Sequence, residues 1–170
     1  MISGNKNSSF SKENGNAILG GKIMPFTQVC PDGGDKVWVL TARGVPDLPD
    51  DNYRLIDAYC AVPECDCRVA YIFVVRQCEP DEVLASTNFG WESLQFYKRF
   101  IKKYSPNVHA SDLKGPTLIP WAPQSHIAPV LLEFLSPILQ KPQLERSLRQ
   151  RYHRFKAALL RMERLQSTQK

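Results

Sequence analysis

Three cysteines lie within eight residues of one another near the middle of the chain. Cys60, Cys65 and Cys67 follow the spacing C-x4-C-x-C, and Pro63 lies inside it. Thiolates are soft donors, and zinc accepts a tetrahedral shell that contains three or four of them. Pro63 stiffens the segment and so lowers the entropy lost when it closes around a metal. We interpret the cluster as a zinc site; the alternative is that the three are small buried side chains.

A fourth ligand can be argued from the expected strand pairing. If strands 36–41 and 53–60 pair antiparallel, Cys60 lies beside the start of the first strand. Cys30 precedes that start by six residues, which span at most roughly 20 Å. Cys30 is therefore the expected fourth ligand, and a histidine from the helical half or a water are the alternatives. Cys78 is separated from the cluster by roughly 35 Å of mostly extended chain, so we expect it to pack elsewhere or to lie exposed.

The other groups that could catalyse a reaction form no convincing arrangement. Ser125 and His126 are adjacent, and neighbouring side chains at the start of a helix diverge too far to form a nucleophile–base pair. We expect Ser125 to cap a helix instead. The aspartates of the 43–52 loop match no cation-binding spacing. We therefore predict no catalytic residue.

Four short motifs, spread over residues 53–160, stand out together. They are Tyr59-Cys60-x-x-Pro63-x-Cys65-Asp66-Cys67, Trp91-Glu92-Ser93-Leu94-x-Phe96-Tyr97, Pro123-Gln124-Ser125 and Tyr152-His153-x-Phe155-Lys156. In these motifs the chain resembles a group of uncharacterised bacterial proteins that are sometimes labelled zinc-chelating or SEC-C-like. The resemblance implies metal binding at Cys60, Cys65 and Cys67 and supplies no activity. The glycines and the terminal Cys-Cys or Cys-His pair of a SEC-C motif are lacking here.

Composition places the chain among ordinary globular proteins. Its 170 residues are 43% hydrophobic and 23% charged, and such values are usual for a soluble domain. The longest apolar run, 69–75, is too short to cross a membrane, and the polar N-terminus lacks the apolar region of a secretory signal. We therefore expect a cytoplasmic protein, in which cysteines act as thiols or metal ligands rather than forming disulfides.

Charge is distributed unevenly along the chain. Residues 36–90 carry a net charge of −4 and residues 91–170 a net charge of +9. Within the basic half, residues 143–166 hold seven Arg and Lys against two Glu. Such a helix face can contact an anionic partner, namely nucleic acid, acidic lipid or an acidic protein surface. A solvated helix face without a partner is the alternative.

The pattern of apolar residues predicts strands first and helices after them. Strands are expected at 36–41, 53–60, 68–76 and 82–88, and helices at 91–104, 125–138 and 142–162. Pro137 is expected to kink or end the second helix. The last helix has one apolar stripe, formed by Leu144, Leu148, Tyr152, Phe155, Leu159 and Met162. This order predicts an α+β fold, with a small antiparallel sheet at about 36–88 and three helices packed on one face of it.

The expected organisation is one domain with a tail. Residues 1–22 are polar and lack a hydrophobic period, so we predict a disordered N-terminal tail there. Residues 23–166 form the single α+β domain, divided into a strand half, 30–90, and a helical half, 91–166.

The favoured function is that of a non-enzymatic zinc-binding protein that serves in recognition or assembly. Two alternatives stay open. One is a metal-dependent hydrolase that uses three protein ligands and an open position for water. The other is a nucleic-acid-binding protein that acts through its basic C-terminal helices.

Overall fold

The computed structural model describes residues 23–33, 37–104 and 108–168, so the tail expected at 1–22 lies outside the described residues. The strands are β1 (Ile23–Pro25), β2 (Trp38–Ala42), β3 (Asp51–Cys60), β4 (Val69–Arg76), β5 (Val83–Gly90) and β6 (Thr117–Leu118). The helices are α1 (Phe26–Val29), α2 (Leu94–Tyr104), α3 (Ala110–Lys114), α4 (Ala128–Leu139) and α5 (Pro142–Ser167), with a short 3-10 turn at Pro31–Gly33.

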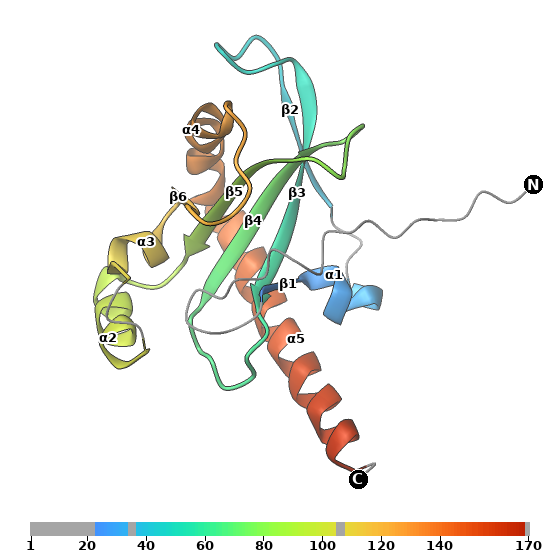
Figure 1. The fold of residues 1–170 in the computed structure, drawn as a ribbon, viewed down its shortest axis with the longest axis vertical. Helices are drawn as coiled ribbons and strands as arrows, with labels where there is room; N and C mark the ends of the chain where they lie inside the picture. Colours follow the sequence, from blue (N-terminus) through green and yellow to red (C-terminus); the bar gives the residue numbers. More distant parts are fainter. Residues whose placement is uncertain (1–22, 34–36, 105–107, 169–170) are drawn as a thin grey trace, which may run out of the picture.

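The strands form one antiparallel sheet in the order β1-β3-β4-β5-β6, and β2 also pairs with β3 (Figure 1). β1 and β2 share one edge of β3, because Ile23 pairs with Cys60 while Trp38 pairs with Leu55. The predicted α+β class and antiparallel sheet are confirmed. The sheet is larger than predicted, since β1 and β6 extend it beyond the expected 36–88.

Helices pack against both faces of the sheet. Along β4, Ala70, Ile72 and Val74 belong to one hydrophobic cluster, together with apolar side chains of α1, α4 and α5. The alternate residues Val69, Tyr71 and Phe73 belong to a second cluster with side chains of α2 and α3. The prediction of three helices on one face is therefore not confirmed. The physical reason is that β4 is apolar on both faces and both must be covered.

Helix α2 starts later than its pattern predicts. Trp91 lies before the helix and packs against Tyr152 of α5, with ring centroids 5.2 Å apart. Tyr97 and Phe100 are the buried residues of α2, and Leu94, its first residue, is exposed.

Helix α4 starts without the predicted cap. Its N-cap position is Ile127, with no side-chain hydrogen bond, so the role expected of Ser125 is wrong. The Ser125 N–H donates to the carbonyl oxygen of Leu84 in β5 over 2.8 Å, and its backbone carbonyl oxygen, rather than its side chain, accepts the N–H of Ala128 at the helix start over 3.1 Å. Pro137 lies within α4, which continues to Leu139.

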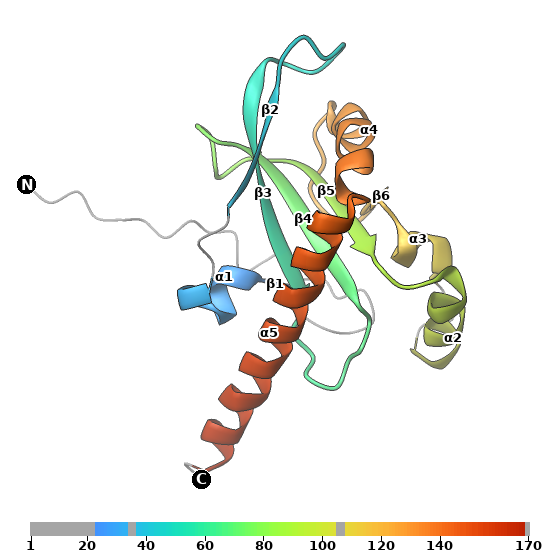
Figure 2. The same cartoon turned by 180° about the vertical axis from the view of Figure 1, so that it is seen from behind.

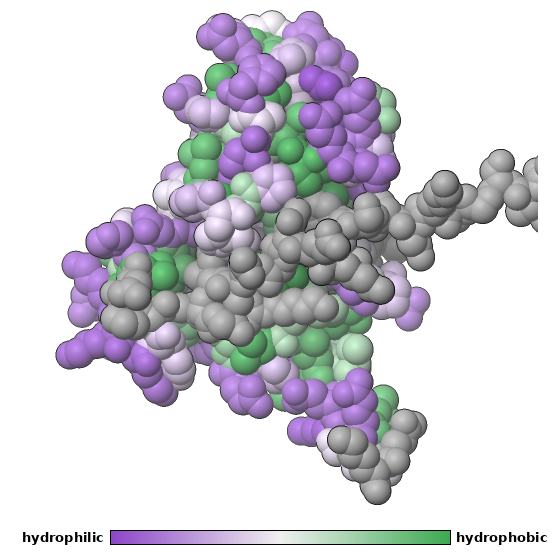
Figure 3. Space-filling view, in the orientation of Figure 1, coloured by the Kyte–Doolittle hydropathy of each residue, from purple (hydrophilic) through white to green (hydrophobic). Residues whose placement is uncertain are grey.

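Helix α5 crosses the sheet face and then extends past the body of the molecule (Figures 1 and 2). Its buried side chains are Leu148, Arg151, Tyr152, Phe155 and Leu159, and most of the predicted stripe is among them. Every residue from 160 to 168 is exposed. The projecting end carries both hydrophilic and hydrophobic residues (Figure 3). Among the described residues, no helix has the length and apolarity needed to cross a membrane.

Candidate metal centre

The connection between β3 and β4 brings the three cysteines together. Cys60 is the last residue of β3, while Cys65 and Cys67 precede β4. The three Sγ atoms all lie within 4.8 Å of one another. Thiolates that share one tetrahedral zinc ion lie about 3.8 Å apart, given Zn–S bonds of about 2.3 Å. The three sulfur atoms therefore need little movement to bind one ion.

The backbone conformation at Arg68 helps to aim Cys67. Arg68 has a φ of 52°, in the left-handed region that costs a non-glycine residue about 1–2 kcal/mol. This residue turns the chain from the cysteine segment into β4, so that Cys67 points back toward Cys60. The Tyr97 hydroxyl donates to the Arg68 carbonyl oxygen over 2.8 Å and so stabilises the turn.

The cysteine cluster is largely shielded from water. Cys67 is 0% exposed and Cys60 4%, whereas Cys65 is half-buried. Cys60 and Cys67 form part of the hydrophobic cluster on the α2 side, beside Tyr71 and Tyr97. A bound ion would therefore be reached from the Cys65 side.

The protonation states of the three cysteines depend on one another. Hydrogen bonds from the thiols of Cys65 and Cys67 lower the pKa of Cys60, although burial opposes this shift. The contacts with Cys60 raise the pKa of Cys65 and raise that of Cys67 well above its ordinary value. Without a cation, the arrangement favours one thiolate held by two thiols. A metal ion supplies the positive charge that allows all three to ionise.

Helix α5 contributes two side chains to the cysteine turn. Lys156 Nζ donates to the carbonyl oxygen of Val62 over 2.5 Å, and its charge also lowers the pKa of Cys60. The Tyr152 hydroxyl lies 3.3 Å from both the Cys65 carbonyl oxygen and Asp66 Oδ1, and it can donate to either one. The helix thus fixes the turn from one side and places a positive charge beside the thiolates.

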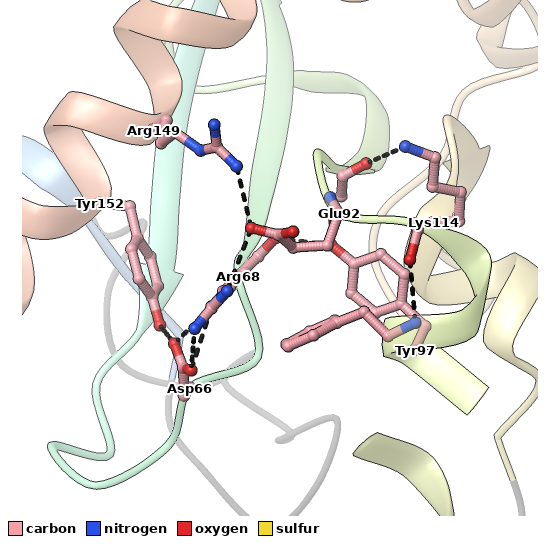
Figure 4. Close-up of polar contacts among 10 residues, drawn as sticks. Asp66, Arg68, Glu92, Tyr97, Lys114, Arg149 and Tyr152 are labelled. Atoms are coloured by element: carbon pink, nitrogen blue, oxygen red, sulfur yellow. Dashed lines mark hydrogen bonds and ion pairs between the residues drawn. The ribbon is translucent and has the colours of Figure 1, made fainter. Parts of the chain in front are cut away.

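A network of ion pairs joins the turn to the rest of the fold (Figure 4). Arg68 binds both carboxylate oxygens of Asp66, the shorter contact being 2.7 Å, and also contacts Glu92 at 3.2 Å. Arg149 of α5 contacts the same Glu92 oxygen at 2.9 Å. The side chains of Glu92 and Arg68 are 21% and 37% exposed, so each pair is worth about 1 kcal/mol or less. Their main effect is to position the turn.

Cys30, the fourth ligand expected from the sequence, lies outside the group of Cys60, Cys65 and Cys67. It packs against the hydrophobic cluster on the α5 side of the sheet, whereas the three grouped cysteines lie on the α2 side. The reason is strand register. Trp38, at the start of β2, pairs with Leu55, and the neighbour of Cys60 is Ile23 of β1.

The remaining candidate ligands also lie outside the group. All five cysteines and three histidines of the chain fall within the described residues, and Cys60, Cys65 and Cys67 are the ones that come together. Cys78 is exposed, one of the two outcomes expected for it. The chain itself therefore offers three cysteine ligands and no fourth cysteine or histidine.

The supporting residues around the site escaped sequence reasoning. Lys156 was counted only as part of a basic helix face, Tyr152 only as a core residue, and Glu92, Arg68 and Arg149 were given no role. The short motifs were the one signal that pointed toward some of these residues. Tyr59, Glu92 and Tyr152 each lie in a different one of the four motifs. Tyr59 and Tyr152 pack together, with ring centroids 5.9 Å apart.

Comparisons of the chain with models of known protein families, with curated proteins and with solved structures found no match. The function is therefore argued from the site itself.

Proposed function

We propose that the chain is a zinc-binding protein that serves in recognition or assembly rather than in catalysis. The single observation that carries this proposal is the convergence of three cysteine Sγ atoms to within 4.8 Å at the end of a sheet hairpin. Cytosolic thiols that converge in this way are typical metal ligands. A set of three thiolates suits zinc, which binds soft sulfur ligands in a tetrahedral shell and has no redox chemistry.

The surroundings of the cluster support a structural role for the ion. Two acidic groups near the cluster, Asp66 and Glu92, are held in ion pairs with Arg68, and Glu64, beside Cys65, is exposed. A general base must be placed to take a proton from a reacting group, and these carboxylates instead position the turn. The ion would clamp the β3–β4 hairpin and hold its connection against α5.

Metal content tests this proposal. The purified protein is stripped with a chelator, reloaded with zinc and analysed for bound metal. We expect one ion per chain for the wild type, much weaker binding by Cys65→Ser, and wild-type binding by Cys30→Ser. Both variants replace a cysteine with serine, Cys65 inside the cluster and Cys30 outside it. If Cys65→Ser retains zinc as tightly as the wild type does, the proposal is wrong.

A metal-dependent hydrolase is a second candidate, because the chain supplies three cysteine ligands and no fourth cysteine or histidine. Catalytic zinc sites also use three protein ligands and leave one position for water. Water-proton relaxation of the cobalt-substituted protein separates the two candidates. A rapidly exchanging bound water favours the hydrolase, and its lack favours the structural role.

The projecting end of α5 supports a further proposal, binding of an anionic partner through residues 143–166. Arg161 and Arg164 lie in the exposed part of this helix. If a nucleic acid is the partner, its affinity falls as salt rises, because phosphate contacts release counterions. An affinity for an oligonucleotide that is independent of salt, or that is unchanged in an Arg161→Gln, Arg164→Gln double variant, contradicts this proposal.

A further inference from the structure

Helix α2 presents a continuous basic surface. All of its basic residues are exposed, and these α2 cations are Lys98, Arg99, Lys102 and Lys103. Because an α-helix has about 3.6 residues per turn, the four positions share the side opposite the buried Tyr97 and Phe100. Helix α2 lies at an edge of the molecule (Figure 1), where hydrophilic residues gather (Figure 3). Positive charge that is concentrated on an exposed surface attracts an anionic partner.

The charge of the α2 cations is not cancelled by neighbouring groups. Among the residues that the structure describes, none of the four forms an ion pair. Neither α2 itself nor the connection 105–109 contains an acidic residue. The adjoining segments carry acidic and basic side chains in equal number, namely Glu64, Asp66, Glu92 and Asp112 against Arg68, Lys114, Arg149 and Lys156. The charge of α2 therefore remains in excess at this edge.

The basic residues of α5 are used differently from the α2 cations. Arg149 pairs with Glu92, and Arg151 pairs with Asp57. Lys156 donates to the cysteine turn. These three contacts hold the fold together, whereas the α2 cations make no such contacts among the described residues. Helix α2 is therefore a second basic surface, separate from the projecting end of α5, and it does not depend on the zinc centre.

An exposed aromatic ring lies at the end of α2, beside the α2 cations. Phe96, Phe100 and Tyr104 follow one another at intervals of four residues, with ring centroids 6.2 Å and 4.9 Å apart. Phe100 is buried, while Tyr104 is 52% exposed. The ammonium of Lys103 lies 4.8 Å from the centroid of the Tyr104 ring. A nucleotide can use both groups, since a base stacks on an aromatic ring and its phosphate binds a cation on a flexible stem.

These features favour nucleic acid over the other anionic partners. A helix that binds a membrane surface inserts its apolar face, but Tyr97 and Phe100 of α2 pack inside the protein. Lysine is depleted at protein–protein interfaces, and three of the four α2 cations are lysines. The bases of a duplex stack on one another, whereas those of a single strand are free to stack on a side chain. An exposed ring among cations therefore favours a single strand.

We propose that α2 is a binding surface for single-stranded nucleic acid, with phosphates on the α2 cations and a base on the ring of Tyr104. Phosphate contacts carry no sequence information, and every base has a face that can stack. Binding is therefore independent of sequence. Neither contact involves the sugar, so RNA and DNA strands of equal length bind alike.

The salt dependence of binding tests the phosphate contacts. The purified full chain is titrated into a fluorescein-labelled single strand of about 12 nucleotides, within the site size of known single-strand binders. Each phosphate contact contributes about 0.7 to the slope of log affinity against log salt, so four contacts weaken binding roughly 50-fold between about 50 and 200 mM salt. The double variant Lys98→Gln, Lys102→Gln should reduce this loss to about sevenfold. The matched variant Lys98→Arg, Lys102→Arg should keep the wild-type slope.

Substitution of Tyr104 tests the base contact separately. Tyr104→Leu should weaken binding of the single strand by about fivefold or more, as expected for the loss of one stacked base. Its salt slope should equal that of the wild type, because no cation is removed. Tyr104→Phe keeps the ring and should retain wild-type affinity. If Tyr104→Leu binds as tightly as Tyr104→Phe, no base stacks on this residue and the proposal is wrong.

The remaining outcomes concern the surface and the class of partner. If the α2 double variant Lys98→Gln, Lys102→Gln keeps the wild-type salt slope while Arg161→Gln, Arg164→Gln lowers it, the binding surface is α5 and this inference is wrong. A duplex of the same length that binds as tightly as the single strand also overturns it. So does binding to vesicles of phosphatidylserine and phosphatidylcholine, or to polyglutamate, without binding to the strand. None of these measurements involves bound metal, so failure of the zinc proposal leaves them unaffected.

Discussion

Lys156 of α5 donates a hydrogen bond to the carbonyl oxygen of Val62 over 2.5 Å, although 94 residues separate them in the chain. Val62 lies in the turn between Cys60 and Cys65, and its carbonyl oxygen also accepts the Cys65 N–H at 3.1 Å. One carbonyl group thus joins the last helix to the cysteine segment. The contact fixes the turn and places the ammonium beside the thiolates.

Replacing Lys156 with Met is expected to weaken zinc binding by about tenfold, because groups that support metal ligands commonly contribute 10- to 100-fold to affinity. Met keeps most of the stem and removes the charge and the hydrogen bond. Affinity is measured by competition with a chromophoric chelator. Lys156→Arg serves as the control and should stay closer to the wild type. Equal zinc affinities of Lys156→Met and the wild type would show that the contact between Lys156 and Val62 does not contribute to zinc binding.

Zinc binding should release about two protons at neutral pH, since metal ligands must be deprotonated. Hydrogen bonds lower the pKa of Cys60, so this thiol is already ionised. The pKa values of Cys65 and Cys67 are raised, so both carry protons that zinc displaces. Affinity therefore increases with pH and is lost on acidification. Calorimetry in buffers of different ionisation enthalpy counts the protons released per zinc ion. A release near zero would show that Cys65 and Cys67 are not protonated before zinc binds.

The variant Cys65→Ser should have a lower free energy of unfolding than the wild type, and the difference should equal the contribution of zinc binding. A ligand that binds only the native state stabilises it by mass action, so we expect a loss of several kcal/mol at most. The three cysteines belong to the hydrophobic cluster on the α2 side rather than to the core between α5 and the sheet, and far-UV circular dichroism should therefore remain near wild type. Cys78→Ser should cost less, because this thiol is exposed. Thermal unfolding with and without chelator makes the comparison; if neither Cys65→Ser nor chelator changes the melting temperature, the cysteines are packing residues.

The buried ion pair between Asp57 and Arg151 should be costly to break from one side. Arg151 Nε lies 2.7 Å from Asp57 Oδ2, and the side chains of Arg151 and Asp57 are 10% and 6% exposed. The guanidinium also lies over the ring of Phe26, 3.9 Å from its centroid. Removing one partner from such a pair costs about 3–5 kcal/mol, because a buried charge is left alone. Arg151→Met should destabilise the protein by this amount in urea unfolding, and adding Asp57→Leu should recover part of the loss. Strictly additive losses would contradict coupling of the pair.

The substitution Ser125→Ala distinguishes the observed position of this residue from the expected one. If Ser125 capped α4, the change would cost about 1 kcal/mol. Its Oγ is instead buried, and it has no hydrogen-bond partner among the described residues. Removing an unsatisfied buried hydroxyl relieves a desolvation penalty, so we expect unchanged or slightly increased stability. If Ser125→Ala lowers the free energy of urea unfolding by about 1 kcal/mol or more, Ser125 does cap α4.

Local sequence determined the longer strands and helices and the cysteine turn. The continuous apolar run in β4 and the stripe of Leu148, Phe155 and Leu159 in α5 each identify an element without knowledge of its partners. The spacing of Cys60, Cys65 and Cys67 in a short connection is similarly local, because few residues separate the thiols and a turn brings them close. These features depend on neighbours along the chain, and a single sequence contains that information.

The tertiary structure alone decided which faces and edges meet. Cys30 lies on the opposite side of the sheet from the cysteine group because β1, rather than the start of β2, pairs with the end of β3. The helices divide between two faces because both sides of β4 must be buried. Lys156 reaches Val62 only after α5 has packed across the sheet. Such contacts arise from the burial of distant apolar surfaces against one another, and no spacing along the chain encodes their register.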